Sequence, residues 1–199
     1  EILDIQSLVD AARSQNVNGA QGLPTSFANL GYSELRLTNG NYYFDDADNI
    51  GYTKIVVDGN AALYINGDVD NIGAEVIRLT TGSTLDLYVS GAVRNIGHIY
   101  LGDKNAPSSF RLYIGGREKA TVSVGNSIFN GAIYAPEANI HYIGNTKIRG
   151  ALFAKSLTGT GNLVVGYAPP KPSEDCEDPD PDKEPEPEPD PNEEDPPVI

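Results

Sequence analysis

Three tyrosines recur at a nearly constant spacing and are the first candidates for a binding site. Tyr64, Tyr88 and Tyr113 each lie between two apolar residues, in runs that read Leu-Tyr-Ile or Leu-Tyr-Val. Side chains alternate sides along a strand, so apolar neighbours that face a core turn the tyrosines outward. On adjacent strands the rings would stack as an aromatic stripe. Such a stripe either binds a glycan or a partner protein or simply stabilises its own strands.

Aspartates in two turns raise the question of a calcium site. Asp46 and Asp48, and again Asp68 and Asp70, match the first two ligand positions of a calcium-binding loop. Isoleucine occupies the third ligand position in both turns, and the glycine-rich calcium repeat of some β-helices is absent. The chain has one cysteine, which leaves no cysteine-based metal site. We therefore expect solvated aspartates, with no metal and no cofactor.

Residues suited to catalysis are few and scattered. The two histidines, His98 and His141, lie far apart along the chain and share no evident site. Polysaccharide lyases and hydrolases built on β-helices align acidic and basic side chains on one outer face, and Asp58, Asp86 and Arg111 could be arranged in this way. No spacing requires that arrangement. The sequence therefore predicts no catalytic residue and no enzymatic activity, with a carbohydrate-active β-helix enzyme as an alternative.

The segments that carry these residues repeat along the chain. Residues 63–67 (Leu-Tyr-Ile-Asn-Gly) recur in similar form at 87–91 and 112–116. A second repeat, Gly-Ala-Ile-Tyr-Ala at 131–135, recurs as Gly-Ala-Leu-Phe-Ala at 150–154. Repeats of about 17 to 25 residues made of short strands and tight turns are typical of a β-solenoid. We predict an all-β chain that forms a single-stranded, right-handed parallel β-helix, with a β-sandwich of accidental similarity as the alternative.

Glycine-asparagine pairs mark the corners of the predicted coils. Asn126, Asn145 and Asn162 each follow a glycine. Glycine adopts a positive φ without strain, and asparagine tolerates the left-handed region. An asparagine side chain at a corner can also bond the backbone of the next coil. We therefore predict that these three asparagines form a structural corner ladder.

The chain divides into three parts where its composition changes. Apolar residues at helical spacing over residues 2–12 predict a short helix, within a capping segment of residues 1–24 that covers the N-terminal end of the stack. The β-helix is predicted for residues 25–168, and the prolines beyond it stop strand pairing. Residues 169–199 hold 11 of the 14 prolines and no glycine. We expect this last part to be a disordered Pro/Asp/Glu-rich linker.

Charge separates the same parts. The formal net charge is −14, and residues 169–199 carry −11 of it, from 13 acidic residues against two lysines. The body is nearly neutral and slightly acidic, which disfavours nucleic acid as a partner. No apolar run reaches about 18 residues, so we expect no membrane span.

A stiff acidic tail suits a spacer that leads to a further C-terminal domain. The sequence contains no methionine, which points to a chain processed or cut from a longer one. In an exported protein of this kind, the single Cys176 could pair with another chain.

A run near the C-terminal end of the β-helix resembles a known family. Residues 130–139 read Asn-Gly-Ala-Ile-Tyr-Ala-Pro-Glu-Ala-Asn and residues 150–156 read Gly-Ala-Leu-Phe-Ala-Lys-Ser, each followed by a Gly-Asn pair. The pattern is similar to the right-handed β-helix domain of bacterial envelope proteins of the PilX-like type IV pilus assembly and mannose-sensitive haemagglutinin pilus agglutinin-biogenesis type. The similarity is close over residues 125–167 and looser before them. The ending Gly-Tyr-Ala at 166–168 departs from the usual Tyr-Asp.

The resemblance implies a non-catalytic domain that is exported to the cell surface or the exterior of a bacterium. It carries no catalytic residues to transfer. The implied partners are pilus components, other surface proteins or glycans, and the implied function is a structural or adhesion module that displays a rigid β-helix on an extended acidic spacer. A bactofilin-like scaffold that polymerises end to end is the first alternative, and a carbohydrate-active enzyme is the second.

Overall fold

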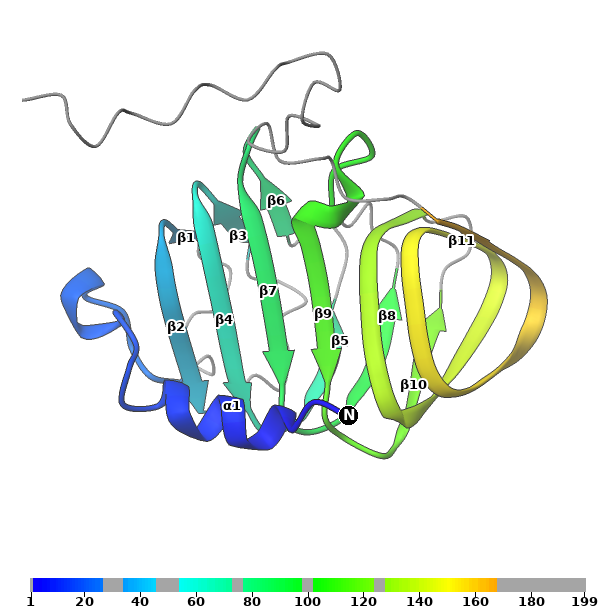
Figure 1. The fold of residues 1–199 in the computed structure, drawn as a ribbon, viewed down its shortest axis with the longest axis horizontal. Coiled ribbons are helices and arrows are strands. Elements are labelled where there is room, and N and C mark those ends of the chain that lie inside the picture. The colour runs from blue at the N-terminus through cyan, green and yellow to red at the C-terminus, as the bar shows by residue number, and fades with distance from the viewer. Residues whose placement is uncertain are drawn as a thin grey trace, which may run out of the picture.

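The computed structural model describes residues 2–26, 34–45, 54–72, 77–97, 102–123 and 128–167 (Figure 1). Short strands separated by turns make up most of this chain, and one α-helix precedes them. In chain order the elements are α1 (Ile5–Ala12), η1 (Gly19–Gln21), β1 (Glu34–Leu37), β2 (Gly40–Asp45), β3 (Lys54–Val57), β4 (Asn60–Asn66), β5 (Val69–Ile72), β6 (Ile77–Leu79), β7 (Thr84–Val89), β8 (Val93–Gly97), η3 (Pro107–Ser109), β9 (Phe110–Ile114), β10 (Lys119–Ser123) and β11 (Ile128–Gly166). Of the helices in these ranges, none is long and apolar enough to cross a bilayer.

The strands wind as a parallel β-helix. Strands β1, β3 and β6 form one sheet, and a second sheet runs in the order β2-β4-β7-β9-β11-β10-β8-β5. Each ladder between the described strands is parallel. Strand β11 pairs with both β9 and β10 because its 39 residues wind around the molecule, as the yellow coils of Figure 1 show. The predicted β-helix is confirmed, and the β-sandwich alternative is wrong.

The register of the coils follows the sequence repeat. Leu63 of β4 lies opposite Leu87 of β7, and Leu87 lies opposite Leu112 of β9. All three leucines are fully buried. The similar runs at 63–67, 87–91 and 112–116 are therefore successive coils of the solenoid, and residues at matching positions stack on one another.

One apolar core fills the interior of the coils. Buried and half-buried residues alternate along β4 and β7, as expected for strands with one face on a core. Burying one leucine or isoleucine side chain stabilises a fold by roughly 1.5–3 kcal/mol. A single coil cannot enclose its own apolar face, so this stabilisation arises only when neighbouring coils stack.

The N-terminal helix is shorter than predicted, and it lies along the side of the solenoid. Helix α1 begins after Asp4, whose carboxylate accepts a hydrogen bond from the Ser7 N–H at 3.0 Å. Ile2 and Leu3 precede the helix and are exposed. The helix crosses the outer face of β2, β4 and β7 (Figure 1). It therefore covers one side of the stack, and the end of the stack is covered by the residues that follow it.

Those following residues pair with the free edge of β2. The Val17 N–H donates to the Asn41 carbonyl oxygen at 2.8 Å. The Asn18 side chain donates from Nδ2 to the Tyr43 carbonyl oxygen at 2.7 Å and accepts from the Tyr43 N–H at 3.0 Å. Asn18 is only 1% exposed. Its amide thus stands in for the peptide group that a further strand would offer, and it closes the edge of β2 at the N-terminal end.

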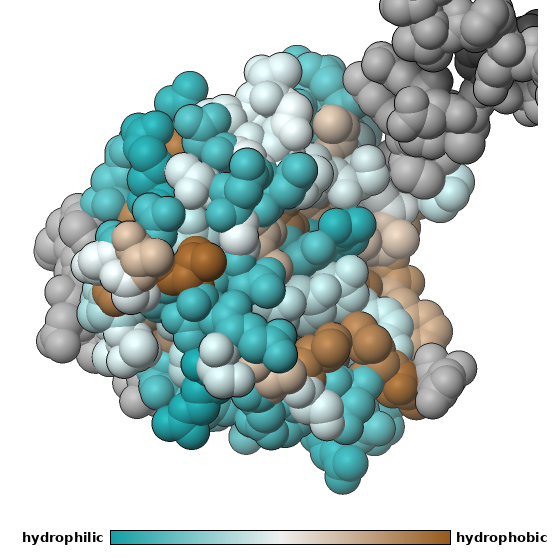
Figure 2. Space-filling model, turned by 60° about the vertical axis from the view of Figure 1, so that its left-hand side comes forward, coloured by the Kyte–Doolittle hydropathy of each residue, from teal (hydrophilic) through white to brown (hydrophobic). Residues whose placement is uncertain are grey.

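The surfaces of the two ends differ. The N-terminal end, which is turned toward the viewer in Figure 2, is mostly hydrophilic with small separate hydrophobic patches. At the opposite end, residues 155–162 and 164–167 are all exposed. Large apolar side chains are exposed on this last part of the chain: Phe153, Leu157, Val164, Val165 and Tyr167.

Candidate functional site

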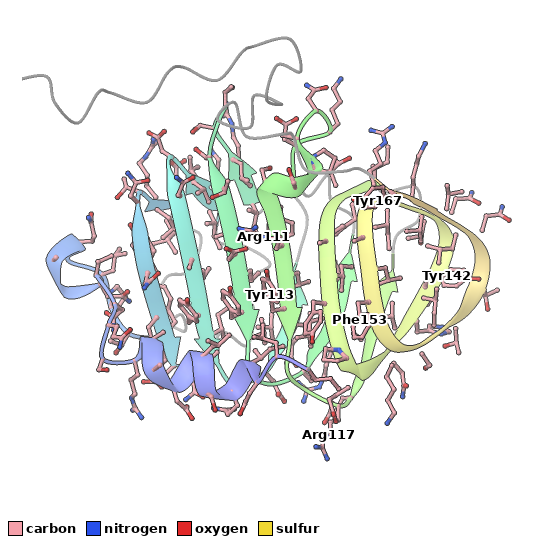
Figure 3. All side chains as sticks on the ribbon, in the orientation of Figure 1. Arg111, Tyr113, Arg117, Tyr142, Phe153 and Tyr167 are labelled. Carbon is pink, nitrogen blue, oxygen red and sulfur yellow. The ribbon has the colours of Figure 1, made fainter. Side chains whose placement is uncertain are left out.

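The outward tyrosines of β4, β7 and β9 form a stacked aromatic ladder. The ring centroids of Tyr64 and Tyr88 lie 4.7 Å apart at an interplanar angle of 6°, and those of Tyr88 and Tyr113 lie 4.4 Å apart at 8°. The rings stack because each occupies the same position in successive parallel coils. Figure 3 shows Tyr113 on the outer face of β9, on the same strand as Arg111. The three residues of the predicted stripe therefore lie together.

Three further rings extend the ladder beyond the predicted stripe. Tyr43 of β2 lies opposite Tyr64. Tyr134 of β11 lies 6.0 Å from Tyr113 at 55°, and Phe153 stacks on Tyr134 at 5.2 Å and 11°. These rings lie outside the predicted stripe because their neighbours differ from the Leu-Tyr-Ile pattern. An aromatic residue at the corresponding place in each coil was the signal that could have found them.

Helix α1 packs over most of this aromatic ladder. The buried face of the helix consists of Ile5, Val9 and Ala12. These residues cluster with Tyr43, and four more rings pack against the cluster: Tyr64, Tyr88, Tyr113 and Tyr134. Just before the helix, the Leu3 N–H donates to the Tyr134 hydroxyl at 3.0 Å. The predicted stripe is therefore half-buried beside a helix and is not an open face.

Burial changes the acidity of the tyrosines. Burial first, and then the negative charge of Asp86, raises the pKa of all three predicted stripe tyrosines above the ordinary value. Burial and a hydrogen bond to Asp45 raise the pKa of Tyr43 to about 12. Its hydroxyl donates to that carboxylate at 2.7 Å. At neutral pH the ladder therefore offers uncharged rings and hydroxyl groups, which suits packing or stacking better than proton transfer.

Two residues considered for catalysis bind each other. Arg111 of β9 contacts Asp86 of β7 through two N–H groups, with Nη2 lying 2.7 Å from Oδ2. This pairing raises the pKa of Arg111. Asp58 lies in the turn after β3 and accepts a hydrogen bond from the Thr80 hydroxyl at 3.0 Å. The structure thus brings Asp86 and Arg111 together as a contact between coils and gives Asp58 a different partner.

The aspartates of the second calcium candidate bind an arginine. Arg94 of β8 pairs with Asp70 and with Asp68, the latter at 2.6 Å. Its Nε lies 3.4 Å from Glu118 on the next coil. In the described ranges, no three His, Cys, Asp or Glu side chains are grouped so as to hold a metal ion. These acidic side chains therefore link three coils through one guanidinium.

Part of the predicted corner ladder is visible. The Asn162 side chain donates from Nδ2 to Asn145 Oδ1 at 3.0 Å. The preceding Gly161 has φ of +118°, a conformation that favours glycine. The two asparagines thus contact each other across one coil step of 17 residues.

Of the remaining residues considered as functional candidates, the structure describes His141. His141 Nδ1 lies 3.2 Å from Thr158 Oγ1 in the next coil. It therefore makes the same kind of contact between coils as the asparagines. The candidates outside the described residues are Asp46, Asp48, His98, Asn126 and Cys176.

A small hollow of about 310 Å³ lies where the chain enters α1. Its lining includes Leu3 and Asp4 together with Arg117 and Glu137. Arg117 Nε lies 2.8 Å from Glu137 Oε2, with the arginine side chain 82% exposed (labelled in Figure 3). Arg117 and Glu137 pair with each other at the rim, and the Asp4 carboxylate accepts hydrogen bonds from Ser7, so these charged groups are engaged within the chain.

Comparison with known proteins places the chain in a family. No curated protein and no solved structure matches the chain. A family model described as a domain of unknown function matches residues 3–170. The match includes helix α1 as well as all the described strands, so the helix and the coils are one unit of that family. The chain therefore belongs to the DUF7305 family.

Proposed function

We propose that the chain is a non-catalytic structural and adhesion module of a bacterial cell surface or pilus-associated assembly. In this role the β-helix is a rigid body, and the acidic residues 169–199 form an extended connection to the rest of the assembly. Export, a surface location and contact with pilus components, other surface proteins or glycans are parts of the same proposal.

One observation carries the proposal: several of the described side chains that could do chemistry, among them Asp86, Arg111 and His141, are engaged in contacts between coils. Arg94 binds carboxylates of the coils on both sides of it. Lys54 binds Glu34 of the preceding coil at 2.9 Å. Groups engaged in this way stabilise the stack and do not converge on a substrate. This arrangement supports the proposal of a rigid structural module.

The sequence resemblance supports the cellular setting of the proposal. The residues that carry it, 130–139 and 150–156, form the last coils of the solenoid. Glycine at position 150 suits that stacking, because its φ is +144° and an added methyl group would collide with the Gly131 carbonyl group. The similarity to pilus-type envelope proteins thus lies in residues that build the coils.

The packing of α1 narrows the adhesion part of the proposal. Tyr64, Tyr88 and Tyr113 lie beside the helix, so a glycan can reach only the parts of these rings that the helix leaves free. Phe153 at the end of the ladder is 54% exposed. An aromatic contact with a partner is therefore expected to involve Phe153 at the end of the ladder more than the rings beside the helix.

Two experiments test the proposal in cells and in solution. Protease treatment and antibody labelling of intact bacteria that express the whole gene product should reach this domain, and protection of the domain until lysis would contradict a surface location.

A glycan array and a pull-down with a sheared pilus fraction should find a partner. Phe153→Ser should weaken its binding, and Phe153→Leu, which keeps an apolar side chain but loses the ring, shows whether the ring itself is needed. No binding in either assay would contradict the adhesion role.

The structure also bears on the polymer-forming alternative. Head-to-tail stacking of identical solenoids needs a free strand edge at both ends, and the Asn18 side chain occupies the edge of β2. Electron microscopy of the protein should therefore show separate particles. Regular filaments would favour the bactofilin-like scaffold over our proposal.

A further inference from the structure

The aromatic ladder ends in a ring with one free face. The ring of Phe153 stacks on that of Tyr134 at 5.2 Å and 11°, and Phe153 is 54% exposed. The described chain places no second ring on the other side of Phe153. Tyr88, in the middle of the ladder, has a stacked ring on each side, and Tyr43 at the other end is only 2% exposed. Phe153 is therefore the member of the ladder that offers a flat apolar face to a ligand.

The surroundings of Phe153 hold this face in place. Tyr134, on which the ring stacks, accepts a hydrogen bond at its hydroxyl from the Leu3 N–H at 3.0 Å and packs against the apolar cluster of α1. Before and after Phe153 in the strand, Leu152 and Ala154 pack against the core of the solenoid. A ring supported in this way is oriented before a ligand arrives, so less conformational entropy is lost on binding.

Two basic side chains flank the ring on the same face of the strand. Because Leu152 and Ala154 pack on the core, the alternation of the strand turns Arg149, Phe153 and Lys155 outward. Arg149 is half-buried and Lys155 is exposed. At about 3.3 Å per residue, Lys155 lies about 7 Å from Phe153 along the strand, and Arg149 lies about 13 Å from it in the opposite direction. The ring thus has one cation before it and one after it along the outer face.

These cations lack the carboxylate partners that basic side chains have elsewhere in the stack. Arg94 and Arg111 both bind aspartates of neighbouring coils. Residues 138–167 contain no acidic residue, and neither Arg149 nor Lys155 forms an ion pair within the described residues. With its three basic residues this stretch has a formal charge of +3, in a chain whose net charge is −14. The positive charge beside Phe153 is therefore left to attract an external anion.

We propose that this face binds an acidic glycan, with a uronic acid unit stacked on Phe153, its carboxylate bound by Lys155, and the carboxylate of a neighbouring unit bound by Arg149. The proposal rests on the adhesion role above and names the class of its ligand. A pyranose offers an apolar face of C–H groups to the ring, and the guanidinium of arginine matches a carboxylate with two parallel hydrogen bonds. An acidic peptide would use the cations without needing the free ring face, so the ring favours the glycan.

Binding of polyuronates to the full-length chain tests the class of ligand. The probes are oligomers of galacturonate, mannuronate and hyaluronate, each compared with its methyl ester, which keeps the sugar rings and removes the charge. In calorimetry we expect an acid form to bind about tenfold more tightly than its ester. Equal binding of the two forms, or no binding of any acid form, would overturn the proposal. A neutral glycan or a pilus protein found as the partner instead would leave the adhesion role standing, whereas the absence of any partner would contradict both.

Substitutions separate the contribution of the charges from that of the ring. Arg149→Gln combined with Lys155→Gln should weaken binding of the acid form about tenfold and leave the ester unchanged, whereas Phe153→Leu should weaken both. Arg78→Gln combined with Lys104→Gln removes the same two charges from other exposed positions and is the matched control, which should bind as the native chain does. Equal losses in the two double variants would overturn the proposal. Polyglutamate that binds as tightly as the best polyuronate would assign the face to an acidic peptide and would also overturn it.

Discussion

The two ends of the β-helix present the same kind of strand edge in different states. At the N-terminal end, Asn18 bonds both backbone groups of Tyr43, and the Thr25 carbonyl oxygen accepts the Asp45 N–H at 2.6 Å. At the C-terminal end, the last coil finishes in exposed residues. The repeat builds the coils, whereas residues outside the repeat decide where stacking stops. A polar side chain closes the edge of β2 at one end, and the described chain places no such side chain on the last coil at the other.

Because its two ends differ, the molecule is not symmetrical as a scaffold. A closed end and an open end allow contact through one end only. Growth into a filament needs both. The same asymmetry predicts how substitutions at the centre and at the two ends differ in their effects.

The largest loss of stability is expected from replacing a buried leucine by alanine in the middle of the stack. The same replacement in the last coil is the comparison. Leu87→Ala removes a fully buried side chain in the middle of the stack and should lower the free energy of unfolding by about 2–5 kcal/mol. Leu163→Ala acts on a half-buried residue of the last coil and should cost about 1 kcal/mol or less, because less apolar surface is lost. Urea denaturation measures both. Equal losses would mean that the open end is as well packed as the centre.

The next effect concerns the closed end. Asn18→Ala leaves the buried N–H and C=O groups of Tyr43 without their partner and should cost about 1–3 kcal/mol. The freed edge of β2 should also cause concentration-dependent association in sedimentation velocity. Asn41→Ala, whose side chain is exposed on the same strand, is the control and should change stability by less than about 0.5 kcal/mol. An Asn18→Ala protein that remains as stable and as monomeric as the control would refute the role of this side chain.

A distinct spectroscopic signature is expected from α1. Val9→Asp places a charge on the buried face of the helix, and the helix should detach from the ladder. The raised pKa values of the tyrosines should then move down toward the ordinary value, because desolvation is their main cause. Ultraviolet titration of the phenols measures this shift. Ala11→Asp adds the same charge on the exposed face and should leave the titration unchanged; a parallel shift in both variants would contradict the packing of α1 on the rings.

The same tyrosines predict a dependence of stability on alkaline pH. The folded state holds the phenolic protons more tightly than the unfolded state does, so this contribution is complete below the ordinary tyrosine pKa of about 10. It is lost as the pH rises from there through the raised values, of which that of Tyr43 is about 12. Unfolding by urea at pH 8 and at pH 10.5 should show lower stability at the higher pH. A smaller loss in Val9→Asp would assign part of it to the ladder beneath α1, and an equal loss would contradict that assignment.

The smallest effect is expected from the ion pair between β7 and β9. The side chains of Asp86 and Arg111 are 22% and 44% exposed, so solvent and salt screen their attraction. A double-mutant cycle with Asp86→Asn and Arg111→Gln should give a coupling energy of about 1 kcal/mol or less, decreasing with added salt. A coupling of several kcal/mol that is insensitive to salt would mean that this pair lies in a drier site than the structure shows.

Much of the fold could be predicted because stacking makes the repeat visible in the sequence. Leu63, Leu87 and Leu112 fill equivalent interior positions, so the same residue type recurs once in each coil. The pairing register of β4, β7 and β9 could be predicted from the sequence for that reason. The later coils use a different repeat, and this hid the continuation of the ladder through Tyr134 and Phe153.

The placement of the N-terminal segment could not be predicted, because no repeat specifies it. The apolar stripe of α1 shows that the helix packs on something, but the same stripe would fit an end or a side of the solenoid. Asn18 carries no signal in the sequence either, since its function depends on an edge that lies 25 residues away in the sequence. Contacts that join a unique residue to a repeated one leave no periodic signal.

The difference between the two ends is most directly tested by residue-resolved hydrogen exchange of the full-length protein. The Tyr43 N–H points outward from the first coil to Asn18, and we predict that it exchanges as slowly as amides in the middle of the stack. Alternate amides of residues 161–166, which point away from the preceding coil, should exchange much faster. A Tyr43 amide that exchanges as fast as those amides would contradict the conclusion that one end is closed and the other is open.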